Sequence, residues 1–248
     1  MEATSDSIVL ENDSDLRFYD DTRIVFGSDA ELIVAVRPEG SDLLERSTLD
    51  QIAELVADLE QVEGVQAVTS LLTVPLFQSP PVGLLNVSQG YKTLEDETID
   101  LDLAGQELLS NPIYSNALIS GDGRTTALTL RLSDDPELAG LEVRRYELRD
   151  AERSDQLSPE LKAELETVER RYKALNTEHG DRRRREIEQI RSVLTQHRDI
   201  GRIEIGGVPM IAVDIVEYVE RDIVVFGVSV ALFVLLVLGI LFRSLKWT

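Results

Sequence analysis

The sequence predicts an α+β protein, in which a ferredoxin-like (split β-α-β) domain with an inserted loop and helix region is followed by one transmembrane helix. Apolar runs typical of strands alternate with segments whose apolar residues recur at helical spacing. Without the insertion, the order is β-α-β, then a strand, helices and a last strand, which is typical of helices packed on one face of an antiparallel sheet. The final apolar run, residues 223–242, carries no charged side chain.

The first β-α-β unit follows a polar, extended lead-in at residues 1–22. The run ELIVAVRP at residues 31–38 is almost continuously apolar, which predicts a central strand buried on both faces of the sheet. In the next segment apolar residues recur at helical spacing, and Ser47 or Thr48 can cap this helix. A second apolar run at residues 65–74 predicts the second strand.

Residues 75–116 are predicted to be an insertion of loops and short elements, because Pro and Gly residues interrupt its first part. One short helix is expected near residues 102–110. The apolar side chains among the prolines are the best candidates for a patch that contacts a substrate or a neighbouring subunit. The alternative is that these side chains fill the core of the domain. The residues concerned are Leu76, Phe77, Val82, Leu84 and Leu85.

The pair Asp122-Gly123 predicts a tight hairpin turn, with a positive φ angle, between two strands. In the second of these strands, apolar side chains and a threonine share one face at a period of two, which predicts an antiparallel strand buried on that face. The residues on this face are Thr126, Leu128, Leu130 and Leu132.

Two amphipathic helices are predicted between residues 159 and 197. Ser158 followed by Pro159 is a typical helix start, and Gly180 is expected to separate the two helices. A short strand at residues 202–209 then closes the sheet.

The paired glycines Gly206 and Gly207 predict a turn at the end of this strand, because glycine permits positive φ angles and close backbone approach. Pro209 is suited to the start of the helix that follows. We expect this helix, at residues 210–222, to continue without a break into the apolar run.

The apolar run from Ile223 to Phe242 is long enough to cross a bilayer, because a helix rises about 1.5 Å per residue and the hydrocarbon core is about 30 Å thick. Basic residues follow the run and acidic residues precede it. Since cytoplasmic flanks are rich in Lys and Arg, we expect a cytoplasmic tail at residues 244–248 and an extracytoplasmic domain at residues 23–210. Residues 211–243 are then the helix that enters and crosses the membrane.

The formal net charge of −21 argues against nucleic acid as a partner, because the chain would be repelled by its phosphates. The sequence has no cysteine, which excludes disulfides and thiolate chemistry. It has neither a phosphate-binding loop nor a nucleophile elbow, and we expect its two histidines, His179 and His197, to be solvated. We therefore predict no catalytic, cofactor-binding or metal-binding residue, and no enzymatic activity. The basic run at residues 181–185 is expected to be a helix start balanced by neighbouring acids, with a site for phosphate or an anionic lipid headgroup as the alternative.

Four pieces of the sequence occur in an order that resembles the first extracytoplasmic loop and the second transmembrane helix of resistance-nodulation-division (RND) exporters. The resemblance is closer to the MMPL-like branch, whose members export lipids and other hydrophobic compounds. The pieces are DSIVLENDSDLRFYDDTRIVFGSDAELIVAV, LEQVEGVQAVTSLLTVP, NPIYSNALISGDGRTTALTL and IGGVPMIAVDIVEYVERDIVVFGVSVALFVLLVLGILFRS.

The resemblance implies that the chain is part of a larger efflux permease of the bacterial inner membrane, driven by the proton-motive force. The folded domain would be a periplasmic porter domain, which shapes the path of a lipid or another hydrophobic or amphiphilic substrate. Its partners would be the lipid bilayer, the remaining transmembrane helices, a second porter domain and the other subunits of an oligomer. The proton-coupling acidic residues of the family lie on later helices, so no residue of this sequence takes that role.

A different interpretation is a single-span, membrane-anchored extracytoplasmic module that binds a protein partner. Its binding surface would be the helical region at residues 159–197, where the apolar stripe leaves Arg170, Arg171 and Arg182–Arg185 exposed. The exporter interpretation predicts that the coding sequence continues into further hydrophobic segments, one of them with an intramembrane Asp or Glu. The interpretation as an anchored module predicts no such continuation.

Overall fold

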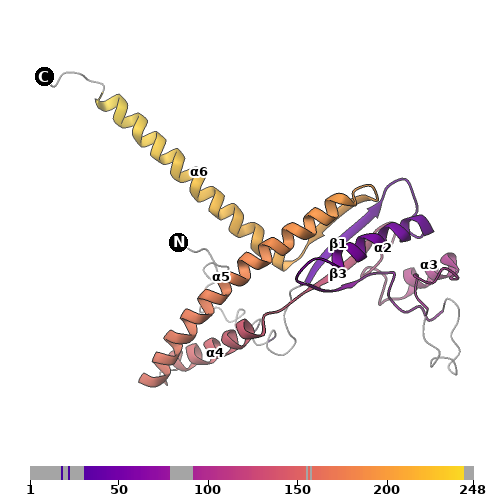
Figure 1. Ribbon diagram of the computed structural model, residues 1–248, viewed down its shortest axis with the longest axis horizontal. Coiled ribbons are helices and arrows are strands. Elements are labelled where there is room, and N and C mark those ends of the chain that lie inside the picture. The colour runs from indigo at the N-terminus through magenta and orange to yellow at the C-terminus, as the bar shows by residue number, and fades with distance from the viewer. Residues whose placement is uncertain are drawn as a thin grey trace.

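The computed structural model of the protein describes residues 31–78, 92–154, 156 and 158–242, together with the single residues 18 and 22. These residues form a four-stranded antiparallel sheet in the order β2-β3-β1-β4, a long helical hairpin and a final helix that extends away from the rest (Figure 1). The main apolar core lies between one face of the sheet and the helices α2 and α5. Most of the predicted lead-in and the predicted tail lie outside the described residues.

The central strand β1 (Glu31–Pro38) lies between β3 and β4 and is antiparallel to both. Alternate side chains from Leu32 to Val36 are fully buried, whereas Ile33 is 52% exposed. The prediction of a central strand is confirmed, but the prediction that both of its faces are buried is wrong. Ile33 and Ala35 made the run continuously apolar, yet alternation along the strand places them on the face opposite to the core.

Helix α2 (Arg46–Glu60) joins β1 to the short strand β2 (Val65–Thr69). It begins earlier than predicted, with Glu45 at the N-cap position, so Ser47 and Thr48 lie in its first turn and are not the cap. Thr48 is buried beside the predicted apolar stripe. The apolar residues of that stripe are all buried, namely Leu49, Ile52, Leu55, Val56 and Leu59.

The insertion contains the predicted short helix, α3 (Leu101–Ser110), and its N-cap residue Asp100 accepts hydrogen bonds from two backbone amides of the first turn. The segment after it pairs with β3 (Thr126–Leu132) through an isolated bridge between Ile119 and Thr126 rather than as a strand. The predicted first strand of the hairpin is therefore wrong. β3 itself has the predicted alternation, and its face toward the core is buried.

The helical hairpin consists of α4 (Pro136–Arg153) and α5 (Pro159–Gln196). Helix α5 starts at the predicted cap, Ser158, whose Oγ accepts a hydrogen bond from a first-turn amide. It then passes through Gly180 without interruption, so the prediction of two separate helices is wrong. Packing explains the continuity, because the first part of α5 contacts α4 and the last part contacts the sheet. Helix α4 was not predicted.

The edge strand β4 (Gly201–Gly206) pairs with β1, and helix α6 (Val208–Phe242) begins almost directly after it. As predicted, α6 continues from the sheet into the apolar run. Its first turns pack against the core, and Arg191 of α5 donates hydrogen bonds to both carboxylate oxygens of Asp214, at 2.8 and 2.9 Å. The start of α6 is thus bound to the domain, while the rest extends away from it (Figure 1).

Candidate functional site

Four large apolar side chains are exposed on and beside α3, within the predicted insertion. Leu103 and Leu109 lie on the helix, Ile113 follows it, and Phe77 belongs to a segment that is hydrogen-bonded to it. Their exposed fractions are 46%, 39%, 70% and 53%. We call them the α3 apolar residues. Exposed apolar side chains of this size are the candidates for a binding region in this part of the domain.

Glu107 holds the backbone of Phe77 in place. The Glu107 side chain is buried, with 2% of its residue surface exposed, and its two carboxylate oxygens accept hydrogen bonds from consecutive amides. The Phe77 amide donates to Oε1 at 2.6 Å, and the Gln78 amide donates to Oε2 at 2.9 Å. The sequence did not predict a role for Glu107. The sequence feature that could have indicated its burial is the position of an acidic residue among the inward-facing positions of a short amphipathic helix.

The segment before Phe77 is held by further bonds. Leu76 is fully buried, and its amide donates to the carbonyl oxygen of Lys92 at 2.8 Å. The Tyr114 hydroxyl donates to the carbonyl oxygen of Pro75 at 2.6 Å. Burial raises the pKa of Tyr114, and the neighbouring Glu107 carboxylate adds to this rise. Tyr114 therefore stays protonated as a hydrogen-bond donor across the physiological pH range.

The structure divides the residues that were predicted to contact a substrate or a subunit. Phe77 is exposed, whereas Leu76 is not part of the surface. Neighbouring side chains of an extended segment point in opposite directions, so Leu76 fills the core, which is the alternative that the sequence left open. Val82, Leu84 and Leu85 lie outside the described residues. A contact between Phe77 and a substrate stays a prediction.

The predicted turn at Asp122-Gly123 has the backbone geometry that glycine favours, with a φ of 70° at Gly123. The Asp122 carboxylate accepts hydrogen bonds from the Ser120 hydroxyl at 2.5 Å and from the Arg124 amide at 3.1 Å. These bonds, that from Ser120 above all, hold the pKa of Asp122 below its usual value. The charged carboxylate thus stabilises the turn at neutral pH.

The second predicted turn, between β4 and α6, depends on one of its two glycines. Gly207 has a φ of 139°, and a Cβ atom there would lie 2.6 Å from the carbonyl oxygen of Glu31. A Cβ on Gly206 would meet no described atom within 4 Å. Pro209 is the second residue of α6. Gly207 therefore permits the close contact between the start of α6 and β1.

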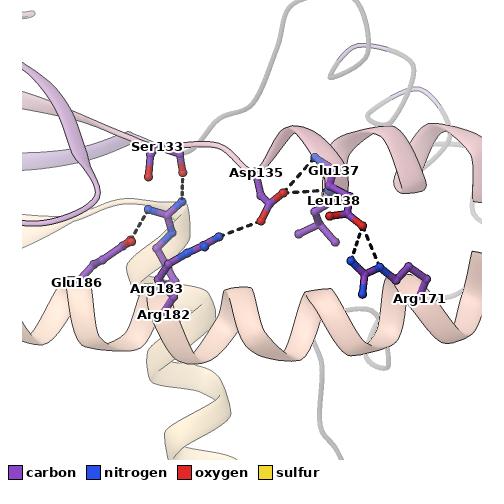
Figure 2. Close-up of polar contacts among 8 residues, drawn as sticks. All are labelled: Ser133, Asp135, Glu137, Leu138, Arg171, Arg182, Arg183 and Glu186. Carbon is purple, nitrogen blue, oxygen red and sulfur yellow. Dashed lines mark hydrogen bonds and ion pairs between the residues drawn. The ribbon is translucent and has the colours of Figure 1, made fainter.

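A buried ion pair lies at the base of the helical hairpin (Figure 2). Arg183 Nη1 donates to Glu186 Oε2 at 2.7 Å, and both side chains are almost fully buried. Arg183 Nη2 donates to the carbonyl oxygen of Ser133, the residue directly after β3, at 2.9 Å. Burial raises the pKa of Glu186, and the adjacent guanidinium opposes this rise. This arginine lies four residues before Ile187, on the inward face of α5, and that spacing is the sequence signal for its burial.

The neighbouring Arg182 reaches the start of α4. Arg182 Nη2 donates to Asp135 Oδ2 at 3.1 Å, and Asp135 also caps α4 by accepting hydrogen bonds from the amides of Glu137 and Leu138. The bond from the Leu138 amide and the pairing with Arg182 hold the pKa of Asp135 below its usual value. Further along the hairpin, Arg171 donates two hydrogen bonds to Glu137.

These contacts correct two predictions about the arginines. The predicted exposed basic surface on α5 is wrong in part, because Arg183 is buried and both Arg171 and Arg182 pair with acids of the α4 region. The basic run at residues 181–185 lies in the middle of α5 and not at a helix start. The prediction that neighbouring acids balance the charge of this run is confirmed for Arg183, which pairs with Glu186.

The prediction of solvated histidines is wrong for His197 and correct only in part for His179. His197 Nε2 lies 2.8 Å from Asp58 Oδ2, and the His197 side chain is 14% exposed. His179 is half-buried, and its pKa is lowered by burial and by the charges of Arg183 and Arg182, against the opposite effect of the acids at positions 134 and 135. Among the residues described, no group of three or more His, Asp or Glu side chains is arranged to hold a metal ion.

Helix α6 is the one helix, in the part of the chain that the structure describes, that is long and apolar enough to cross a membrane. Its apolar stretch, Val208–Gly239, contains a window with a mean hydropathy of 2.6, and none of that window is buried inside the protein. The core helix of a soluble protein would be mostly buried. The exposed apolar length of α6 therefore indicates a lipid environment.

The comparisons with known proteins agree with this arrangement. Residues 172–247 match the family model of the MMPL family. This stretch, called the MMPL region below, is similar to that family and covers less than half of the chain. The MMPL region begins in α5, includes β4 and continues through α6, and it confirms the resemblance to RND/MMPL-like exporters. No curated protein and no solved structure matches the chain. The MMPL region and its apolar helix support a membrane protein, and a transporter of the RND/MMPL kind.

Proposed function

We propose that this chain supplies the periplasmic substrate-path domain, and one membrane helix, of a proton-motive-force-driven exporter of lipids or other hydrophobic or amphiphilic compounds. The observation that carries the proposal is the MMPL region, because it joins part of the folded domain to the apolar helix α6. The proposal places the exporter in a bacterial inner membrane and includes no enzymatic step. The domain contributes a surface for the substrate, while proton coupling is assigned to other helices of the permease.

The sheet supports a ferredoxin-like, split β-α-β interpretation of the domain. One unit consists of β1, α2 and β2, and the other consists of β3, α5 and β4. In the strand order β2-β3-β1-β4, the two strands of each unit are separated by one strand of the other unit. Helix α4 and the insertion around α3 are additions to this pattern.

The α3 apolar residues support a hydrophobic or amphiphilic substrate. Their side chains are exposed although the domain is otherwise strongly acidic, and Glu107 holds Phe77 at the surface through its backbone. An apolar side chain on a fixed backbone loses little conformational entropy on binding, which favours affinity.

The orientation in the membrane is tested by cysteine labelling, because the natural chain has no cysteine that would react. The variants Asp122→Cys and Leu235→Cys are compared in spheroplasts with a membrane-impermeant maleimide. We expect labelling at position 122 before lysis and no labelling at position 235 until the membrane is dissolved. Labelling at position 122 that requires lysis would overturn the proposed orientation.

The transport function is tested in everted vesicles that contain the intact permease. Movement of a fluorescent phospholipid should require a proton gradient and should stop when a protonophore is added. The variant Phe77→Ser should lower the rate several-fold, whereas Ile33→Ser, on the open face of the sheet, should leave the rate unchanged. Transport that survives the protonophore would contradict the energy source, and equal rates for both variants would contradict the role of the α3 apolar residues.

A further inference from the structure

The described residues form two separate apolar cores that share helix α5. The larger core includes the sheet, α2 and the last part of α5, where Ile187 and Ile190 are fully buried. The smaller core lies between α4 and the first part of α5, and it is formed by Leu148, Leu165 and Val168. The sheet with α2 and the end of α5 is called the body below, and α4 with the start of α5 is called the arm. The arm extends away from the sheet (Figure 1).

Ion pairs make the arm a unit of its own. Arg144 pairs with Glu164 at 2.7 Å, and Arg149 pairs with Glu169 at 2.9 Å, so each pair joins α4 to α5. The guanidinium of Arg145 lies over the ring of Tyr172, at 4.4 Å from its centre. Bonds between the two helices, and a core between them, favour movement of the arm as a rigid unit.

Gly180 lies on α5 between the two cores. A Cβ atom there would meet no described atom within 4 Å, so packing does not require a glycine at this position. Glycine in the middle of a helix is less favourable than alanine by about 1 kcal/mol, because it leaves the backbone more freedom. In the interior of α5, the residue with the lowest helix propensity therefore lies at the boundary between body and arm.

The chain crosses the same boundary a second time at residues 133–135. Ser133 is fixed to the body, since its amide donates to the carbonyl oxygen of Gly64 at 2.8 Å and its own carbonyl oxygen accepts from Arg183. Asp135 belongs to the arm, because it caps α4. Between them lies the exposed residue Asp134. The chain thus crosses the boundary once at the exposed residue Asp134 and once, within a continuous helix, at a glycine without a side chain.

One ion pair spans the boundary at this point. Arg182, on the body side of Gly180, donates to Asp135 on the arm at 3.1 Å. The buried pair of Arg183 and Glu186 lies entirely on the body side and stays intact when the arm moves. Breaking the contact of Arg182 therefore leaves no buried charge without its partner, which keeps the free energy of this change small.

A hollow of about 320 Å³ borders this contact and leaves room for movement. It is lined by residues of the body, such as Glu63 and Glu186, and by residues of the connection and arm, such as Asp134 and Pro136. A close-packed boundary would resist a change in the angle between the two units, whereas an open one does not.

We propose that the arm is hinged to the body at Gly180 and Asp134, and that the ion pair between Arg182 and Asp135 latches it in the arrangement seen here. The hinge gives the domain two arrangements of a long projecting element relative to its sheet. It does not rest on the transporter proposal, because it concerns the domain alone and is measured without transport.

The test measures distances between body and arm in the full chain, reconstituted in lipid nanodiscs. Spin labels are placed on Glu54→Cys in α2 and on Glu166→Cys in α5, which is direct because the chain has no native cysteine. Pulsed electron resonance then gives the distribution of distances between the labels. We expect Arg182→Gln to broaden this distribution or shift its maximum, and Gly180→Ala to narrow it.

Each variant has a matched control. Arg171→Gln removes an ion pair within the arm, and Gly140→Ala fills a second helix glycine whose Cβ would also meet no described atom within 4 Å. Neither control should change the distribution. Amide exchange around residue 180 should slow about fivefold in Gly180→Ala, which corresponds to about 1 kcal/mol. A narrow distribution that Arg182→Gln and Gly180→Ala leave unchanged would overturn the proposal, and so would an equal effect of Arg171→Gln and Arg182→Gln.

Discussion

Replacing Glu107 by alanine should destabilise the domain, because its side chain joins α3 to the segment that carries Phe77. The substitution removes both carboxylate oxygens that accept hydrogen bonds from the amides of Phe77 and Gln78. It leaves these two amides without their acceptors in a partly buried place. The segment that carries Phe77 should then detach from α3.

The magnitude follows from the two bonds. A hydrogen bond to a charged group contributes about 1.5–3 kcal/mol. Water can reach part of this site, because the amides are partly buried, so we take the lower value for each bond and expect a loss of about 3 kcal/mol. For a domain of this size, such a loss lowers the melting temperature by about 6–12 °C.

The assay is thermal unfolding of the full chain in nanodiscs, followed by circular dichroism. The matched control is Asp102→Ala, which removes an exposed carboxylate from the same helix and should change the free energy of unfolding by less than about 0.5 kcal/mol. If Glu107→Ala and Asp102→Ala melt at the same temperature, the carboxylate does not hold the Phe77 segment, and the reasoning is refuted.

Three further predictions follow from individual contacts. Gly207→Ala should lower the free energy of unfolding by about 2–4 kcal/mol in denaturant titrations, because a Cβ at this positive φ would overlap the backbone of β1. The control Gly206→Ala should change the free energy of unfolding by less than about 1 kcal/mol. Leu76→Ala should lower the free energy of unfolding by about 2–5 kcal/mol, as expected for a core leucine. Phe77→Ala should lower it by less than about 1 kcal/mol. Equal losses in the two variants would show that Leu76 is not a core residue. Burial and the neighbouring arginines lower the pKa of His179 in the folded protein. When the pH falls below about 6.5, His179 therefore binds a proton more readily in the unfolded chain than in the folded one. The melting temperature should then fall on acidification through this range. His179→Gln should remove this part of the pH dependence, and an unchanged profile would contradict the assignment.

The four strands of the sheet and the apolar helix α6 were predictable because each depends on a local pattern, although a similar pattern also predicted a strand before Asp122 that does not form. β1 has the predicted bounds, and α6 continues from the sheet into the apolar run as expected. The open face of β1 was not predictable, since Ile33 and Ala35 are apolar although they lie opposite to the core. A run of apolar residues shows that a strand can be buried on both faces, but it does not show that a second layer is present.

The helical hairpin shows where local patterns fail. Gly180 is a typical interruption of a helix, yet α5 continues because contacts with α4 and with the sheet stabilise it on both sides. Helix α4 was missed because its pattern is dominated by charged residues, with Leu148 as its one fully buried side chain in the described range. Its stability depends on ion pairs with α5, and such pairs between distant segments leave no periodic signal in the sequence.

The residues that organise the candidate site were hidden for a related reason. Glu107 and Arg183 are charged, and charged side chains are expected at the surface. Their burial depends on partners far away in the sequence, the amides after Pro75 in one case and the carbonyl oxygen of Ser133 in the other. Spacing alone places both on inward-facing positions, but it does not identify these partners.

Helix α6 is 35 residues long, which corresponds to about 52 Å, whereas the hydrocarbon core of a bilayer is about 30 Å thick. The surplus length begins directly after β4 and is clamped to α5 by the pair of Arg191 and Asp214. A thinner or thicker bilayer changes the tilt of an embedded helix. Because the single residue Gly207 joins the sheet edge to the helix, we expect lipid composition to change the inclination of the sheet relative to the membrane surface.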